Sequence, residues 1–425
     1  MSNVPEGWVE TTLGEVASIN PREPMKKGTI AKCVAMEKLP AFDKRITGFE
    51  LKPFKGGTKF RNGDTLLARI TPCLENGKTA YVDILDEGEV GFGSTEYIVI
   101  REKEALSDKQ FLFYLATSPR FREIAIKCMT GTSGRQRVQT DVLINKPLFL
   151  PPLPEQKAVA DMLSSFDEKI ELLREQNKTL ETLAQTIFKA WFCEFEFPQA
   201  HPSPDLSQRE RGYKSSGGEM VEFELGLIPK GWRVGGLLEV FELIGGGTPK
   251  TSVDEYWNGD IPWYSVVDAP KGYDTFVIDT EKKISVLGLE KSSTKLLRKG
   301  TTIVSARGTV GKLALVGRET AMNQSCYGIQ GKDYFGDYYV YYQVKQALDD
   351  LKRNVHGAVF DTITQATFKH IEVPIPDMDM TGNFERFVEP IMDKILNNVF
   401  QIQTLSKTRD TLLPKLMSGQ IRVKF

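Results

Sequence analysis

Hydrophobic residues recur at alternating steps of four and three along the middle of the chain. The positions that follow this rule are Phe166, Ile170, Leu173, Asn177, Leu180, Ala184, Ile187 and Trp191. Such a heptad seam is typical of a helix that pairs with another helix, and neither Gly nor Pro interrupts it. A proline-rich turn at Pro151–Pro154 precedes it. The pattern predicts one long helix within residues 151–193.

A second seam lies 225 positions further along the chain. Its members are Ile391, Ile395, Asn398, Ile402, Leu405, Arg409, Leu412 and Leu416. Two amphipathic helices that each cover a local core are the alternative explanation. Against it, a helix of roughly 38 residues would be about 57 Å long, more than one domain of ordinary size can cover. We therefore expect the two helices to pair through Ile170, Leu173, Leu180 and Ile187 on one side and Ile395, Ile402, Leu405 and Leu412 on the other.

The segments before the two helices are also repeated. "PEGWVETTLGEVASI" from Pro5 returns as "PKGWRVGGLLEVFEL" from Pro229, and "TLLARITPCLENGKTAYV" from Thr65 is echoed by "TTIVSARGTVGKLALV" from Thr301. Apolar strand-like runs around Gly-bearing turns predict, for each half, an α+β domain with a small, mostly antiparallel sheet and flanking helices. The expected domains are 1–150 and 223–376, with helical segments at 151–193 and 377–425 and a Pro-, Ser- and Gly-rich linker at 194–222. Each domain precedes its helix, so antiparallel packing of the helices is the simpler solution.

Two prolines complicate the second helix. Pro390 lies well inside its pattern and Pro414 lies near its end. An interior proline costs about 3 kcal/mol because it removes a hydrogen bond and clashes with the preceding turn. We therefore expect this helix to begin near Pro390, after a separate helical turn around Phe384, and to kink or stop at Pro414.

Bulk composition narrows the class of protein. The chain has 425 residues, 40% hydrophobic and 26% charged, with a formal net charge of −1. A uniformly basic nucleic-acid binder is excluded, so any DNA surface must come from local clusters of Lys and Arg. The five cysteines are far apart and show neither a zinc pattern nor a disulfide framework, which favours a reducing cytoplasm. The sequence shows neither a signal peptide nor an apolar run of membrane-spanning length.

We call the two repeated domains the first and second heads. Antiparallel packing of the helices would relate them by a pseudo-twofold axis, and such an arrangement suits a long ligand that is itself nearly twofold symmetric, such as duplex DNA. The residues also carry a family resemblance. "LPPLPEQKAVADMLSSFDEKIELL" resembles the conserved helix of the specificity subunits of type I restriction–modification systems, and "VPEGWVETTLGEV" and "ELGLIPKGWRVGGLLEV" resemble the starts of their two target recognition domains. The resemblance implies that each head reads one half of a split, asymmetric site. It also implies that the helices hold the heads apart and dock modification (methyltransferase) subunits.

Candidate catalytic motifs do not fit their patterns. No [N/D]-P-P-[Y/F] tetrapeptide of adenine methyltransferases occurs, and "GGGTPKT" and "RGTVGKLA" do not fit the phosphate-binding loop. A loose nuclease-like pattern, Asp268 with Glu281 and Lys283, is better explained by a tight turn. The histidines (His201, His356 and His370) show no metal spacing. Trp263 and Tyr264 could stack on DNA, but core packing is the favoured interpretation.

DNA-contact candidates come from turns and loops that occur in both heads. Arg suits guanine or phosphate, and Gln and Asn suit adenine. The first head supplies Arg69, Lys78, Arg135, Gln136 and Arg137. The second supplies Lys282, Arg307, Lys312, Asn354 and Gln365, with Lys271, Lys283, Arg353, His356 and Thr362 nearby. We expect the Arg69–Lys78 turn to recur as Arg307–Lys312. The alternative is that these side chains, like most Arg and Lys on turns, only form solvated surface.

These observations predict a non-catalytic, cytoplasmic DNA-specificity subunit with no cofactor of its own. The resemblance places S-adenosylmethionine, and ATP with Mg, on partner subunits. Those partners are two modification subunits and, in systems that cleave DNA, restriction subunits. A protein-binding scaffold is the rival from another class, and a fused restriction–modification enzyme is the enzymatic rival, which the missing motifs and the short chain disfavour.

Overall fold

The computed structural model describes residues 5–132, 134–198, 212–215, 217–223, 226–270, 272, 274–354 and 362–424, with only the backbone of 353 and 354. The chain divides into two compact units. Unit 1 comprises Met1–Ile170 and Thr404–Phe425, and unit 2 comprises Glu171–Gln403. The two longest helices, α5 (Leu153–Phe192) and α9 (Met378–Met417), therefore contribute to both units.

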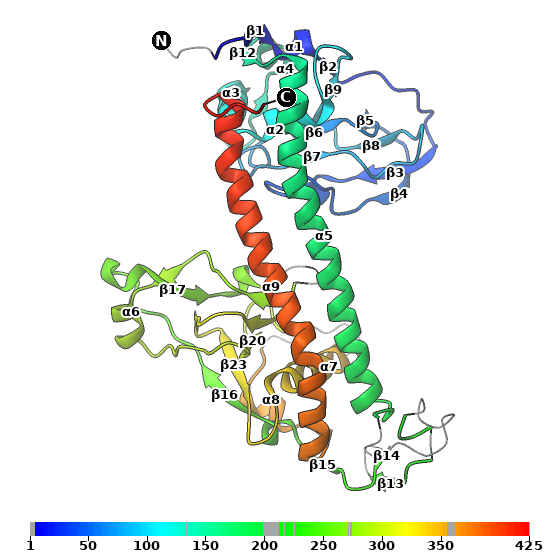
Figure 1. Ribbon diagram of the computed structural model, residues 1–425, viewed down its shortest axis with the longest axis vertical. Coiled ribbons are helices and arrows are strands. Elements are labelled where there is room, and N and C mark those ends of the chain that lie inside the picture. The colour runs from blue at the N-terminus through cyan, green and yellow to red at the C-terminus, as the bar shows by residue number, and fades with distance from the viewer. Residues whose placement is uncertain are drawn as a thin grey trace. The chain divides into compact units, whose positions relative to one another are not determined.

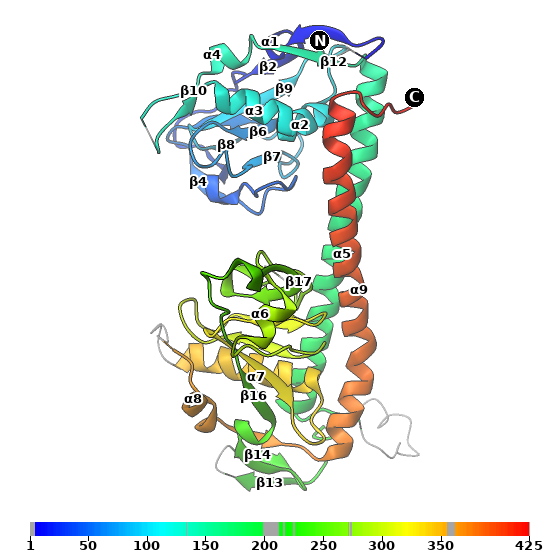
Figure 2. The ribbon, with the colours of Figure 1, turned by 90° about the vertical axis from the view of Figure 1, so that its left-hand side faces the viewer.

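A four-stranded antiparallel sheet forms the centre of unit 1. In spatial order its strands are β2 (Ala17–Ile19), β9 (Tyr97–Glu102), β6 (Thr65–Ala68) and β7 (Thr79–Tyr81). Helix α2 (Lys109–Thr117) packs on β6, β7 and β9, and α3 (Pro119–Lys127) follows it (Figure 2). The side chain of Asp108 starts α2 by accepting hydrogen bonds from the backbone N–H of Gln110 and Phe111.

Smaller elements complete unit 1. A second sheet has the order β4 (Glu50–Pro53), β3 (Ile30–Val34), β8 (Gly91–Gly93) and β5 (Thr58–Phe60), with β3 and β8 parallel. Two antiparallel pairs are β1 (Val9–Thr12) with β12 (Pro147–Leu150), and β10 (Met129–Thr130) with β11 (Arg137–Val138). The short helices are α1 (Leu13–Val16), η1 (Met36–Lys38) and α4 (Thr140–Leu143).

Unit 2 repeats this plan. Its main sheet has the order β16 (Phe241–Gly245), β23 (Cys326–Gly331), β20 (Thr302–Ser305), β21 (Leu313–Val316) and β18 (Phe276–Val277). The first four strands correspond to β2, β9, β6 and β7 of unit 1, and α7 (Asp337–Asn354) packs on β20 and β23 as α2 does on its sheet. The predicted α+β class, with a mostly antiparallel sheet in each half, is confirmed.

The remaining elements of unit 2 surround this sheet. One further sheet has the order β19 (Lys283–Ile284), β17 (Trp257–Tyr264) and β22 (Ala321–Met322). Two pairs are β15 (Arg233–Gly236) with β24 (Glu372–Ile375), and β13 (Met220–Phe223) with β14 (Gly226–Pro229). Short helices are η2 (Leu237–Glu239), η3 (Asp254–Tyr256), η4 (Val266–Asp268), α6 (Val286–Glu290) and α8 (Gln365–Lys369).

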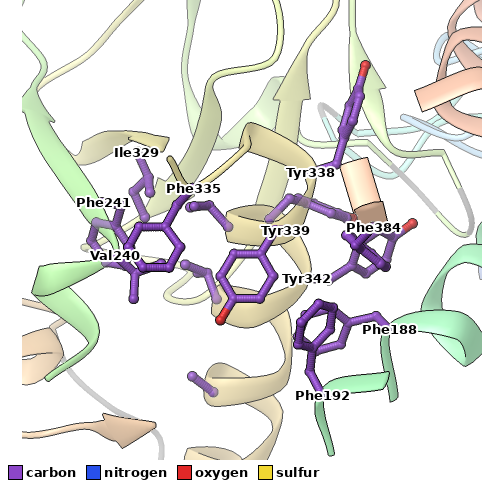
Figure 3. Close-up of a cluster of buried hydrophobic side chains, with 14 of the residues drawn as sticks. Phe188, Phe192, Val240, Phe241, Ile329, Phe335, Tyr338, Tyr339, Tyr342 and Phe384 are labelled. Carbon is purple, nitrogen blue, oxygen red and sulfur yellow. The ribbon is translucent and has the colours of Figure 1, made fainter. Parts of the chain in front are cut away.

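Within unit 2, α5 and α9 pack side by side and against α7 (Figure 1). Phe188 of α5 lies with its ring centroid 5.8 Å from that of Phe384 of α9 and 5.7 Å from that of Tyr342 of α7 (Figure 3). Closer to the N-terminus of α5, Asn177 accepts a hydrogen bond from Asn398, further along α9. Residue numbers thus rise along one helix as they fall along the other, so the pair is antiparallel.

The same orientation holds within unit 1. Val159 and Leu163 of α5 share a core with Leu416 and Met417 of α9. Eight residues after Val159, the carboxylate of Asp167 accepts from Nη1 of Arg409 at 2.5 Å. The predicted antiparallel helix pair is therefore confirmed in both units.

The seam positions differ in how deeply they are buried. Ile170, Leu173 and Ile395 are at most 3% exposed. The other named positions, Leu180, Ile187, Ile402, Leu405 and Leu412, are half-buried.

The expected start of the second helix near Pro390 is wrong. Helix α9 begins at Met378 and runs through Pro390 and Pro414 to Met417. Thr381, Phe384 and Val388, before the proline, are fully buried in unit 2, and this packing holds the first turns in line. Pro390 itself is exposed. The buried residues before it therefore offset the cost of the hydrogen bond that the proline removes.

Part of the predicted linker is also packed. Phe195 and Phe197 are buried in unit 2 against Trp232, with both ring centroids 5.6 Å from that of the indole. Burial of the two rings removes apolar surface from water, and this stabilisation outweighs the preference of the surrounding polar residues for solvent. Residues 199–211, including His201, lie outside the described residues.

Candidate nucleic-acid interface

Three segments far apart in sequence meet at one end of β6 in unit 1. The backbone N–H of Arg69, just after β6, donates to the carbonyl of Glu96, just before β9, at 3.0 Å. The carbonyl of Arg69 accepts from Val138 of β11 at 2.8 Å, and Thr71 N–H donates to the carbonyl of Gln136 at 3.0 Å. We call this meeting point, formed by Glu96, residues 69–78 and residues 135–138, the first junction. All five DNA-contact candidates of the first head lie in these segments.

Unit 2 contains an equivalent second junction, formed by Ser325, residues 306–312 and residues 362–365. Ala306 N–H donates to the carbonyl of Ser325 at 2.8 Å, and Ile363 N–H donates to the carbonyl of Ala306 at 2.9 Å. An isolated bridge joins Arg307 to Thr362, as one joins Ile70 to Arg137 in unit 1. The same backbone framework therefore carries different side chains in the two heads.

Strand register shows which residues correspond. Thr65 of β6 pairs with Ile100, and Thr302 of β20 pairs with Ile329, at equivalent places in the two sheets. Counting forward, Arg69 corresponds to Ala306, and Arg307 corresponds to Ile70. The lysines do correspond, because the carbonyls of Lys78 and Lys312 accept from Ala68 and Ser305, which are equivalent. The expected recurrence of the turn thus holds for the lysine, whereas the arginine is displaced by one residue.

Charge pairing distinguishes the first junction. Arg137 pairs with the Glu96 carboxylate through Nε and Nη2, which lie 2.9 Å and 2.8 Å from Oε1. Nε of Arg69 lies 3.8 Å from the other oxygen, Oε2. The hydrogen bonds to Glu96 raise the pKa of Arg137. These side chains are 23% (Glu96), 31% (Arg69) and 43% (Arg137) exposed, so solvent reaches all of them. In the second junction the corresponding residues are Ser325, Ala306 and Thr362, which carry no charge.

The other candidates of the first head lie in varied surroundings. Lys78 donates from Nζ to the carbonyl of Met36 at 2.9 Å, which engages its ammonium inside the unit. Arg135 is exposed and Gln136 is half-buried.

Among the candidates of the second head, Lys282, Arg307, Lys312 and Gln365 are exposed. Gln365 is the first residue of α8, whose N-terminus is capped by Thr364. Asn354 is the last residue of α7, and its side chain lies outside the described structure, as do the side chain of Arg353 and all of Lys271 and His356.

The motifs that suggested other chemistry have structural roles. Trp263 and Tyr264 are buried at 7% and 0% exposure, so they belong to the core and do not form a DNA wedge. Both oxygens of Asp268 accept hydrogen bonds that close a turn, from Ser265 and from the backbone of Glu281, while Lys283 pairs with Asp279. Within the described ranges, no cluster of three or more His, Cys, Asp or Glu side chains is placed to hold a metal ion. None of the described helices combines the length and apolar character needed to cross a membrane.

Sequence reasoning missed Glu96, the residue on which the first junction converges. Its segment, "GSTEY", carries no basic or aromatic cluster and gives no signal of its own. The available hint was its position directly before an apolar strand that repeats in the second half as "QSCYGI". The pairing of β9 with β6 brings Glu96 to Arg69. The hydrogen bond from Val138 N–H to the carbonyl of Arg69, with the bridge between Ile70 and Arg137, brings Arg137 to the same place.

Comparisons with known proteins agree with this doubled arrangement. A family model described as the type I restriction modification DNA specificity domain matches the chain twice, over residues 5–182 and 229–409. The HindI type I restriction enzyme specificity subunit of Haemophilus influenzae is 26% identical over 419 residues, covering 87% of this chain and 89% of that protein. The MjaIX specificity subunit of Methanocaldococcus jannaschii is 28% identical over 319 residues, covering 74% and 69%. The solved S subunit of a type I restriction-modification system from M. genitalium shares the fold, with a TM-score of 0.56 at 17% identity over 98% of this chain and 97% of that one.

Each family match contains one head with its junction, and the two matches together span most of the sequence. The chain therefore belongs to the type I restriction–modification DNA specificity family.

Proposed function

We propose that the chain is a non-catalytic subunit in which each junction reads one half of a split, asymmetric DNA site. The observation that carries this proposal is the repeated hydrogen-bond framework, in which Ala306 and Ser325 of one head repeat the backbone contacts of Arg69 and Glu96 of the other. A shared framework with different side chains suits two heads that approach DNA alike and read different bases. Sequence is read by side chains at base edges, whereas the backbone framework positions them.

The chemistry of the exposed side chains supports DNA as the ligand. Arg135, Arg137 and Arg307 can donate to guanine or to phosphate, and Gln365 can form a bidentate pair with adenine. Lys312 can neutralise a phosphate. With a formal net charge of −1 the whole chain is not basic, so we expect weak DNA binding by the isolated subunit and tighter binding by the assembled complex.

We further propose that α5 and α9 dock two modification subunits, joined by restriction subunits in systems that cleave DNA. Exposed apolar side chains on the helices support docking. On α5, Leu172 is 52% exposed and Leu183 is 47% exposed. These two leucines are about three helical turns apart and so share one face. Methyl transfer from S-adenosylmethionine and ATP–Mg chemistry would then occur on the partners, in the cytoplasm.

Methylome sequencing of the host tests the proposed function. We expect N6-methyladenine in an asymmetric motif split by unread base pairs, and its loss on deletion of the gene for this chain. Exchange of residues 1–150 for the first head of another family member should change one half of the motif and leave the other intact. A continuous motif, or a change in both halves, would contradict the two-head reading.

A further inference from the structure

The carboxylate of Glu96 joins two arginines that come from different segments of the first junction. We infer that Glu96 is a positioning residue for specificity: it orients the guanidinium of Arg137 to read a guanine in the half-site of the first head. The inference rests on the proposed function, because it assumes that the junction faces DNA.

The geometry of the ion pair leaves the reading edge of Arg137 free. Glu96 accepts from Nε and Nη2, which lie along one side of the guanidinium. The hydrogens at its tip, on Nη1 and the second one on Nη2, are not used by this contact. That tip is the edge that a guanidinium presents to O6 and N7 of guanine in a bidentate pair.

Glu96 restricts the conformations that the side chain of Arg137 can adopt. A free arginine side chain loses rotamer freedom when it binds, and an arginine already held in place loses less. Arg137 is held from two directions, because β11 fixes its backbone against residue 70 and Glu96 fixes its side chain.

Selection among DNA sequences explains a carboxylate at position 96 better than DNA affinity or folding stability does. A carboxylate beside DNA repels phosphate and lowers general affinity, so its presence favours selection among sequences. A solvent-accessible ion pair also contributes little to folding stability. Arg69, with Nε 3.8 Å from Oε2, places a second positive charge beside the carboxylate and helps to hold it at the junction.

Among the described residues of the second junction, no carboxylate pairs with an arginine in this way. The residues at the places of Glu96, Arg69 and Arg137 are Ser325, Ala306 and Thr362, and Arg307 is displaced by one position along the chain. The pre-oriented arginine therefore belongs to the reading of the first half-site, and the described residues of the second junction do not repeat it.

The test uses the full-length chain assembled with its modification subunits and a DNA library randomised over both half-sites. Because a bidentate arginine–guanine pair provides about 1–3 kcal/mol of discrimination, we expect E96Q to reduce the preference for guanine at one position of the first half-site about tenfold. The second half-site should keep its preferences. Affinity for unrelated DNA should rise, because a negative charge is lost. E96D should restore part of the discrimination, which a purely structural change would not do.

The matched control is E123Q, which removes an exposed carboxylate from the Glu123–Lys127 pair on α3 of the same unit. It should leave both half-sites and the unfolding midpoint unchanged. The inference is overturned if E96Q reads the first half-site as the wild type does, or if it alters both half-sites equally. If the wild-type complex itself selects no split site, the proposed function fails. If the wild type selects a split site and E96Q has the same preferences, only the inference about Glu96 fails.

Discussion

Asn398 of α9 donates a hydrogen bond from Nδ2 to Oδ1 of Asn177 of α5, at 2.9 Å, and both side chains are fully buried in unit 2. Asn177 is the fourth position of the first heptad seam, and Asn398 is the third position of the second. A buried asparagine pair costs stability but specifies the register of a helix pair, because any slip buries an unpaired amide. The amide nitrogen of Asn177 and the amide oxygen of Asn398 find no further partner among the described residues.

Replacing one asparagine should cost more than replacing both. In N398L the buried Oδ1 of Asn177 loses its donor, which should lower the free energy of unfolding by about 1–3 kcal/mol. In N177L/N398L an apolar pair of similar size replaces the amides, and most of that loss should be recovered. Urea unfolding of the three proteins measures this difference. A double variant no more stable than N398L would show that the unpaired Oδ1 of Asn177 is not the cause of the loss.

A charge on the buried seam should be far more damaging than one on the exposed face of the same helix. Leu173 is 1% exposed, so L173D buries an unpaired carboxylate and should cost more than about 3 kcal/mol. Leu183, at 47% exposure, is the matched control, and L183D should leave the unfolding midpoint nearly unchanged. Thermal unfolding with circular dichroism distinguishes them. L183D should instead weaken co-purification with modification subunits, and equal melting of both variants would argue against the buried seam.

Glu385 should make stability depend on pH. Burial, with smaller contributions from Asp337 and Glu389, raises the pKa of its carboxyl from 4.5 to about 7, although Tyr339 N–H donates to it at 2.6 Å. A raised pKa means that the folded state favours the protonated acid. This stabilisation is complete below about pH 4.5 and is lost as the pH rises through about 7.

We therefore expect the wild type to lose about 1–3 kcal/mol of stability from this group between those limits. E385Q, which imitates the neutral acid, should lose less. Urea midpoints from pH 5 to 8 provide the measurement. Parallel pH profiles for the two proteins would exclude Glu385 as the cause.

The two equivalent lysines should contribute unequally to DNA binding. Lys312 is exposed, whereas Lys78 donates to the carbonyl of Met36. In the assembled complex, K312A should weaken binding uniformly across sequences and reduce the slope of log affinity against log salt by about 0.9, the value for one phosphate contact. K78A should change the slope less. A K312A complex with an unchanged slope would remove Lys312 from the DNA surface.

The spacing of apolar residues was sufficient to predict an element of structure where a single periodicity determines it. The heptads predicted the two long helices and their pairing, because a stripe of apolar residues must be covered and the other stripe is its complement. The order of domain and helix along the chain predicted that the pairing is antiparallel. The repeated strand-like segments predicted the α+β class of both heads. The resemblance carried by the segment from Leu150 to Leu173 pointed to the family that the comparisons show.

Tertiary packing decided what local patterns could not. Helix α9 passes through Pro390 because Phe384 and Val388 are buried before it, and Phe195 and Phe197 are packed despite their polar neighbourhood. Strand register, a property of two paired segments, matched Arg69 with Ala306 rather than Arg307 and brought Glu96 to Arg137. The sequence by itself determined the repeated heads and the helices that pair, whereas only the fold decided which side chains meet at each junction, since such meetings depend on contacts between residues far apart in the chain.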